Sequence, residues 1–278
     1  MTKRWLVVLI GAAAVAACSG PQLPRTASGP AVLAVRGQVK HGPFALGRAD
    51  LAQLPRAGFR AVDPATGKEA RYDGVALQPL VYQKLERIDG ADTVLIVTAS
   101  KQAVPISPVI LRQFKPILAD TIDGQPAPLQ VAWPNVEQQG IARDARAASW
   151  WAHDVEAIEL VAWDKTWGKA LRTPPGSSDA ARLGAGQYAL RCASCHRLNG
   201  AGGQAGPALD GATGRLGLSR FVAAVRAHPA WQDRIGTELA AGDDVAGQVA
   251  SFLSTVEASG PLPPEEPLTP PSRGARAP

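Results

Sequence analysis

The sequence predicts a multidomain protein in which an α+β domain over residues 31–165 precedes an all-α domain over residues 179–257. Length is the first indication, because 278 residues exceed the roughly 100–150 residues of a common single domain. The second is a series of short apolar runs, divided by Gly and Pro, in the first half of the chain. The third is the helical spacing of apolar residues after residue 178.

Residues 1–17 are expected to form a signal peptide. Lys3 and Arg4 precede an apolar run that ends at Ala17. The run is shorter than the roughly 20 apolar residues that a membrane-spanning helix needs. An export signal therefore explains the segment better than a transmembrane anchor.

Cys18 follows Val-Ala-Ala directly, which resembles a bacterial lipobox. The resemblance implies that the Cys18 sulfur is acylated and anchors the protein to the periplasmic side of a membrane, since two acyl chains give stable anchoring. Ser19 favours the outer membrane, and residues 18–30 are expected to be a flexible tether. The alternative is an ordinary cleaved signal with an incidental cysteine.

Four short apolar runs of the first domain have the length and composition of strands, and one stretch has a helical stripe. The expected strands are Val32–Val35, Thr93–Thr98, Leu129–Trp133 and Val155–Val161, and the stripe is Leu77, Leu80, Val81 and Leu85. His41 and His153 lie in this domain and are expected to be structural. Residues 166–178 are expected to link it to the second domain.

The second domain contains Cys192-Ala-Ser-Cys195-His196, the C-x-x-C-H pattern by which c-type haem is attached. Two thiols three positions apart can each bind one vinyl group, while the following imidazole reaches the iron. A redox dithiol needs a thioredoxin-like βαβ context and a zinc site needs a second Cys/His pair, and the sequence offers neither. One covalent haem c is therefore expected, with His196 as an iron ligand.

The flanks of this motif resemble class I cytochrome c. Gly184, Tyr188 and Cys192 share one stripe of a helix that Ser178 or Asp179 can cap, and a glycine-rich loop then leads to Gly206-Pro207. The resemblance implies that Tyr188 belongs to the haem site and that the Pro207 carbonyl accepts the Nδ1 proton of His196. It also implies a closing helix, and the apolar residues that fit it are Val245, Val249, Phe252, Leu253 and Val256. Residues 258–278 are expected to be a disordered, Pro-rich tail.

The sixth iron ligand is where the sequence departs from that family. Class I cytochromes usually supply a methionine there, and the only methionine is Met1. Two residues compete for the position. His228 stands where the family's Met-Pro-Ala turn would place its methionine, while Leu239 stands in a G-T-x-M-like register and would leave the iron open. The loop length favours Leu239, and His228 is otherwise a plain loop histidine.

The first domain resembles the molybdopterin-binding domain of the sulfite oxidase family. The shared short motifs, in order, are Val35-Arg-Gly-Gln-Val39, Asp50-Leu51, Leu54-Pro55, Tyr72-Asp-Gly-Val-Ala-Leu77, Ser149-Trp-Trp151 and Ile158-Glu-Leu160. In catalytic members a cysteine thiolate ligates molybdenum, and it falls between the counterparts of Pro55 and Tyr72. Residues 56–71 contain no cysteine, so molybdopterin is not expected here and the domain is interpreted as a docking or ligand-binding scaffold.

Composition adds little to these assignments. The net charge is +5, and 27 basic residues face 24 acidic ones once Lys3 and Arg4 leave with the signal. Basic residues form no run of the kind that binds phosphates, so no nucleic-acid partner is expected. A modest positive charge would at most assist docking to an acidic redox partner.

Three functional hypotheses remain. The first is an electron-transfer protein that works with a redox partner protein. The second is a haem enzyme or small-ligand sensor, which requires the open iron site that Leu239 would leave. The third is a molybdenum oxidoreductase with a built-in haem acceptor, and the missing thiolate disfavours it.

Overall fold

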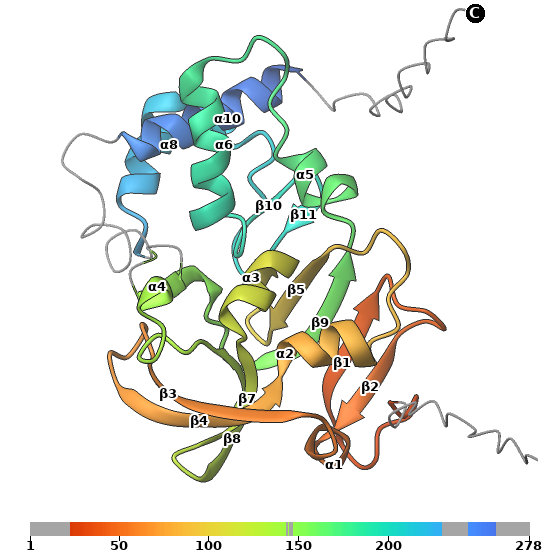
Figure 1. The fold of residues 1–278 in the computed structure, drawn as a ribbon. Helices are drawn as coiled ribbons and strands as arrows, with labels where there is room; N and C mark the ends of the chain where they lie inside the picture. The colour runs from red at the N-terminus through yellow and green to blue at the C-terminus, as the bar shows by residue number, and fades with distance from the viewer. Residues whose placement is uncertain (1–22, 143, 145–146, 230–243, 260–278) are drawn as a thin grey trace, which may run out of the picture.

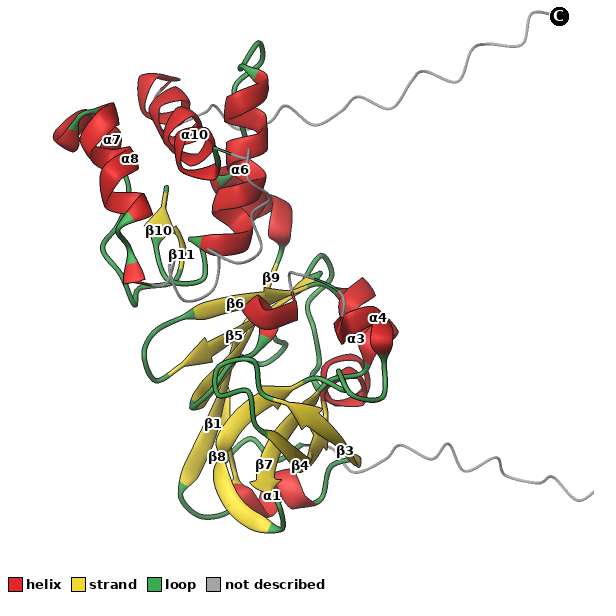
Figure 2. Ribbon diagram, turned by 90° about the vertical axis from the view of Figure 1, so that its left-hand side faces the viewer, coloured by secondary structure: helices red, strands yellow, loops and turns green. Residues whose placement is uncertain are grey.

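The structure is a computed structural model that describes residues 23–142, 144, 147–229 and 244–259. It has two parts, a β-rich domain at one end and a helical domain at the other, as Figure 1 and Figure 2 show from perpendicular directions. No helix among the described residues is long and apolar enough to cross a membrane. The expected signal peptide, Cys18 and residues 260–278 of the expected tail lie outside the described residues. Residues 258 and 259, where the tail was expected to begin, are instead the last two residues of a helix, which corrects that boundary.

The β-rich domain contains two sheets. The five-stranded sheet has the order β2-β1-β9-β5-β6, and only the β1–β9 pair is parallel. Its strands are β1 (Ala31–Gly37), β2 (Phe44–Gly47), β5 (Thr93–Thr98), β6 (Ala103–Ile106) and β9 (Val155–Val161). The antiparallel four-stranded sheet runs β3 (Arg56–Val62), β4 (Glu69–Ala76), β7 (Ile117–Ile122) and β8 (Gln125–Ala132).

Short helices lie against these sheets (Figure 1). They are α1 (Arg48–Ala52), α2 (Leu77–Pro79), α3 (Pro108–Phe114), α4 (Gln139–Ala142), a π-helical turn at Leu80–Lys84 and a 3₁₀ turn at Ala147–Trp150. The predicted stripe of Leu77, Leu80, Val81 and Leu85 is buried, but Pro79 sits inside it and the helix is short. Pro79 removes one backbone donor, which limits a regular α-helix at this point.

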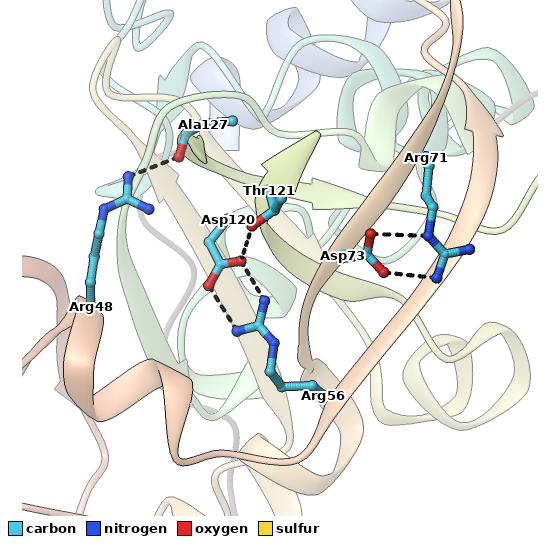
Figure 3. A network of polar contacts seen from close by, with 7 residues as sticks. All are labelled: Arg48, Arg56, Arg71, Asp73, Asp120, Thr121 and Ala127. Atoms are coloured by element: carbon cyan, nitrogen blue, oxygen red, sulfur yellow. Dashed lines mark hydrogen bonds and ion pairs between the residues drawn. The ribbon is translucent and has the colours of Figure 1, made fainter. Parts of the chain in front are cut away.

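Charged side chains connect strands of the four-stranded sheet that are not direct neighbours (Figure 3). Arg56 of β3 donates two hydrogen bonds, of 2.9 and 2.6 Å, to the Asp120 carboxylate of β7 across the intervening β4. Burial acts to raise the pKa of Asp120, but the hydrogen bonds and charge of Arg56 outweigh it and leave the pKa below its ordinary value. This bidentate pair therefore stabilises the sheet while the carboxylate is ionised.

The helical domain is built on two long helices, α6 (Asp179–Arg191) and α10 (Val245–Ser259), that pack against each other (Figure 2). Between them the chain forms β10 (Arg197–Leu198), β11 (Ala201–Gly202), α7 (Ala212–Leu216) and α8 (Leu218–Arg226). The five residues expected on the closing helix are all buried. Gly184 permits the close approach, because a Cβ there would lie 2.5 Å from the carbonyl carbon of Gln248.

The segment expected to be a linker is partly folded, which corrects that expectation. A 3₁₀ turn at Trp163–Lys165 leads into α5 (Trp167–Ala170). Trp167 is only 2% exposed and belongs to an apolar core shared by both domains, with Leu95 and Val161 on one side and Tyr188 on the other. Burial of this large indole surface explains why the segment is ordered, since an aromatic side chain contributes more apolar area than any other.

Candidate haem-attachment site

Helix α6 presents the C-x-x-C-H segment at its end. Ser178 caps its start, since the Ser178 hydroxyl accepts a 3.2 Å hydrogen bond from the Ala181 amide. At the other end the amides of Cys195 and His196 both donate to the Cys192 carbonyl, at 3.0 and 2.8 Å. The motif thus continues as helical turns, which bring both thiols and the imidazole to one end of the helix.

His196 is oriented by hydrogen bonds from both sides. Its Nδ1 lies 2.8 Å from the Pro207 carbonyl oxygen, as the resemblance to class I cytochromes implies. The buried Tyr188 hydroxyl donates a 3.0 Å hydrogen bond to the His196 carbonyl oxygen. With Nδ1 occupied as a donor, Nε2 remains for a metal, and its basicity is raised by the same bond.

Small residues bring the following loop against the motif. A Cβ at Gly206 would lie 2.7 Å from Nδ1 of His196, and one at Gly203 would lie 3.0 Å from the Cys195 Cα. Side chains at these positions would displace the ring or the cysteine backbone. The absence of side chains at these glycines therefore lets the loop backbone pack directly against the C-x-x-C-H segment, as a site for a flat cofactor requires.

The surroundings of Cys192 suit a neutral sulfur. Burial raises the pKa of the Cys192 thiol to about 12, and the adjacent Cys195 adds to the shift. Redox dithiols and zinc ligands depend on an accessible thiolate, which this position disfavours. A thioether carries no charge and loses nothing by burial, so the residues fit covalent haem better than either alternative.

His228 lies beside the proximal histidine. It follows α8, with its amide donating to the Val225 carbonyl, and its ring centroid is 5.9 Å from that of His196 at an interplanar angle of 72°. This is the geometry of an edge-to-face ring contact, and it places a second imidazole beside the His196 ring. Leu239, the competing residue, lies outside the described residues.

The β-rich domain contacts the motif directly, which sequence reasoning did not foresee. The Ala103 amide of β6 donates a 2.8 Å hydrogen bond to the Ser194 carbonyl, between the two cysteines. The Gln204 amide donates another, also 2.8 Å, to the Lys101 carbonyl. Backbone groups carry both bonds, so no side-chain pattern could have signalled them.

The residues described in the β-rich domain offer no thiolate to a metal. Residues 56–71, where the sulfite oxidase resemblance would place one, form most of the β3–β4 hairpin. His153 Nε2 lies 3.0 Å from the Asp63 carboxylate, and His41 lies 3.3 Å from Glu86. Within the described ranges no three His, Cys, Asp or Glu side chains form a group that could hold a metal ion. The hairpin therefore supplies no thiolate at the position where the sulfite oxidase resemblance would place one.

Comparison with known proteins identifies the helical domain. Residues 181–236 match the cytochrome c family, and this domain implies haem c. No curated protein sequence gives a significant match. Similar solved structures include the sulfane dehydrogenase SoxCD of Paracoccus pantotrophus, at 15% identity and a TM-score of 0.36, over 46% of this chain and 37% of that one. The chain thus spans little more than a third of that protein. The predicted order, an α+β domain before a helical cytochrome c domain, is confirmed.

Proposed function

We propose that this chain is a membrane-anchored c-type cytochrome of the periplasm that carries electrons through one covalent haem c. The α+β domain of the same chain would serve as its docking and ligand-binding domain. The observation that carries the proposal is the placement of two imidazoles, His196 and His228, with ring centroids 5.9 Å apart at the C-x-x-C-H segment.

Each residue of the site has a distinct part in this function. Haem c supplies a one-electron couple when bound. Cys192 and Cys195 would hold it through thioethers, and the Pro207 carbonyl, by accepting the Nδ1 proton of His196, would leave Nε2 for the iron. His228 provides the second imidazole. With an imidazole from each histidine as ligand, the iron would favour electron transfer over substrate binding, and its potential would be lower than with a thioether ligand.

Visible spectroscopy tests the ligand assignment. The wild-type protein, produced with a haem-maturation system, should be low-spin in both oxidation states and bind carbon monoxide poorly. His228→Ala should give a high-spin ferrous form that binds carbon monoxide readily. His41→Ala, at an exposed histidine of the other domain, is the control and should leave the spectrum unchanged. A wild-type ferrous haem that is high-spin and reactive would restore the open-site enzyme or sensor.

Mass and metal analysis test the cofactor. The intact mass should include one haem, with iron near one per chain and molybdenum near zero. Cys192→Ala and Cys195→Ala should each weaken or abolish the haem stain that survives denaturing electrophoresis. Wild-type protein without covalent haem would defeat the proposal. Stoichiometric molybdenum would instead revive the molybdenum oxidoreductase.

Cell fractionation tests the anchor. Cys18→Ser should move the protein from the membrane fraction to the soluble periplasm, because the acylated sulfur is lost. The haem spectrum should not change, since Cys18 has no part in the haem site. A variant that stays membrane-bound would show that Cys18 is not the anchor.

A further inference from the structure

A cleft of about 800 Å³ lies between the two domains, on the side of the haem-attachment loop that faces the sheet. Small-molecule sites commonly have volumes of roughly 300–1,000 Å³ and often lie between domains. One wall is the five-stranded sheet, and the others are the α5 region and residues 199–204 of the cytochrome domain. The cleft is large enough for a small organic molecule.

The floor of the cleft is apolar and flat. Ala34 of β1 and Val97 of β5 are both register partners of Ala157 in β9, so the three residues lie in one row across three adjacent strands. Two of them are alanines, which leave space above the sheet. Ala157 and Val97 are only 2% and 8% exposed, so an apolar body such as an aromatic ring would lie against this row and cover chiefly the partly exposed Ala34.

The rim of the cleft is positively charged. Its lining includes five cationic residues but only two carboxylates. Both carboxylates already have cationic partners, with Arg36 at 3.3 Å from Glu159 and Lys101 at 2.6 Å from Glu156. No carboxylate of the described residues lies within ion-pair distance of Lys165 or Lys169, at and before α5. The charge of these two lysines favours an anion.

The cleft wall is hydrogen-bonded to the haem motif. Gly203 and Gln204 line the cleft, and the Gly203 amide donates a 2.8 Å bond to the Ala193 carbonyl. Gly202, also in the wall, would place a Cβ 3.0 Å from the Cα of Arg197, next to His196. A charge held in the cleft would therefore lie close to the residues that bind and orient the iron.

We propose that the cleft binds a small organic anion, a carboxylate or sulfonate on a flat apolar body, and that the haem senses its presence. The inference rests on the proposed function in that the haem must be attached at Cys192 and Cys195. Negative charge near the haem stabilises the ferric form, which carries one more positive charge than the ferrous form. By linkage, the anion binds the ferric protein more tightly and lowers the reduction potential.

Calorimetry on the full-length protein tests the site with naphthalene-2-sulfonate as probe. We expect saturable 1:1 binding of this probe, and much weaker binding of the uncharged naphthalene-2-sulfonamide and of inorganic sulfate. Lys165→Gln/Lys169→Gln should weaken probe binding by about tenfold or more, since hydrogen bonds to charged groups are the stronger ones. Ala34→Leu should block it by filling the floor.

The matched control is Lys68→Gln/Lys115→Gln, which removes two exposed lysines of the β-rich domain that do not line the cleft. This variant should bind the probe as the wild type does. An equal loss of probe affinity in both double variants would show general charge attraction and would overturn the proposed site. Absence of probe binding, or probe binding that Ala34→Leu leaves unchanged, would overturn it as well.

A redox titration with and without the probe tests the coupling. The potential should fall on saturation, and affinity for the ferric protein should exceed that for the ferrous one by roughly fivefold or more. Equal affinities would refute sensing. The same samples show the haem spectrum, so loss of the proposed haem function would be seen separately from failure of the anion site, which calorimetry reports without reference to iron.

Discussion

Gly184→Ala measures how tightly the two long helices of the cytochrome domain are packed. The added Cβ would overlap the Gln248 carbonyl and lie 2.9 Å from the Cβ of Phe252. Because the Gln248 group is backbone, α6 and α10 must separate. Overpacking of this kind costs about 1–3 kcal/mol, while alanine improves helix propensity by about 1 kcal/mol. With backbone as the obstacle, we expect a net loss of about 2 kcal/mol.

Gly186→Ala is the matched control on the same helix. A Cβ at Gly186 would meet no atom within 4 Å, so only the propensity gain of up to about 1 kcal/mol applies. Denaturant unfolding followed by Soret absorbance and far-ultraviolet circular dichroism should separate the two variants by about 3 kcal/mol. The reasoning would be refuted if Gly184→Ala matched the wild type, or if both substitutions changed stability in the same direction.

Three further substitutions test individual contacts. Tyr188→Phe removes the hydrogen bond to the His196 carbonyl and should lower the free energy of unfolding by about 1 kcal/mol with little change in the Soret band; a stability equal to wild type would contradict this role. Gly206→Ala should turn the His196 ring away from Pro207 and alter the haem spectrum. Gly200→Ala, at a residue of the same loop with φ +82° and no atom within 4 Å of the added Cβ, should lose stability through backbone strain without a spectral change. Because the folded pKa of Asp120 is lowered, its contribution to stability is present above the unfolded pKa and lost as pH falls through the folded one. Asp120→Asn should therefore flatten the acid limb of the stability curve, and an unchanged limb would show that the Arg56 pair contributes nothing.

Apolar runs predicted four strands of the β-rich domain and missed β2, β3, β4, β6 and β7. Strands were correctly expected at β1, β5, β8 and β9, because each contains a short run of large or branched apolar residues. β3 and β4 were not expected, because charged residues alternate with small ones along them. Side-chain contacts between β3 and β4, such as Arg60 with Glu69, accompany their pairing, and only the folded sheet brings these residues together.

The sequence predicted the haem-attachment site more fully than the fold around it. Cys192, Cys195 and His196 are close in sequence, and the resemblance to class I cytochrome c implied the contact of Pro207 with His196. The contacts of β6 with the same segment join residues about ninety positions apart through backbone atoms. His228 lies 32 positions beyond His196, and its neighbourhood became clear only from the packing of α8.

The bonds between β6 and the haem-attachment loop also bear on self-association. β6 is an outer strand of its sheet, and an outer strand offers unpaired backbone groups to which another chain can add. Here the Ala103 amide and the Lys101 carbonyl are already engaged by the cytochrome domain. The helical domain therefore covers backbone groups at this edge of the sheet. Residues 23–165 produced alone would expose these groups together with the apolar surface of Leu95 and Val161, and the fragment should be more prone to aggregate than the whole protein.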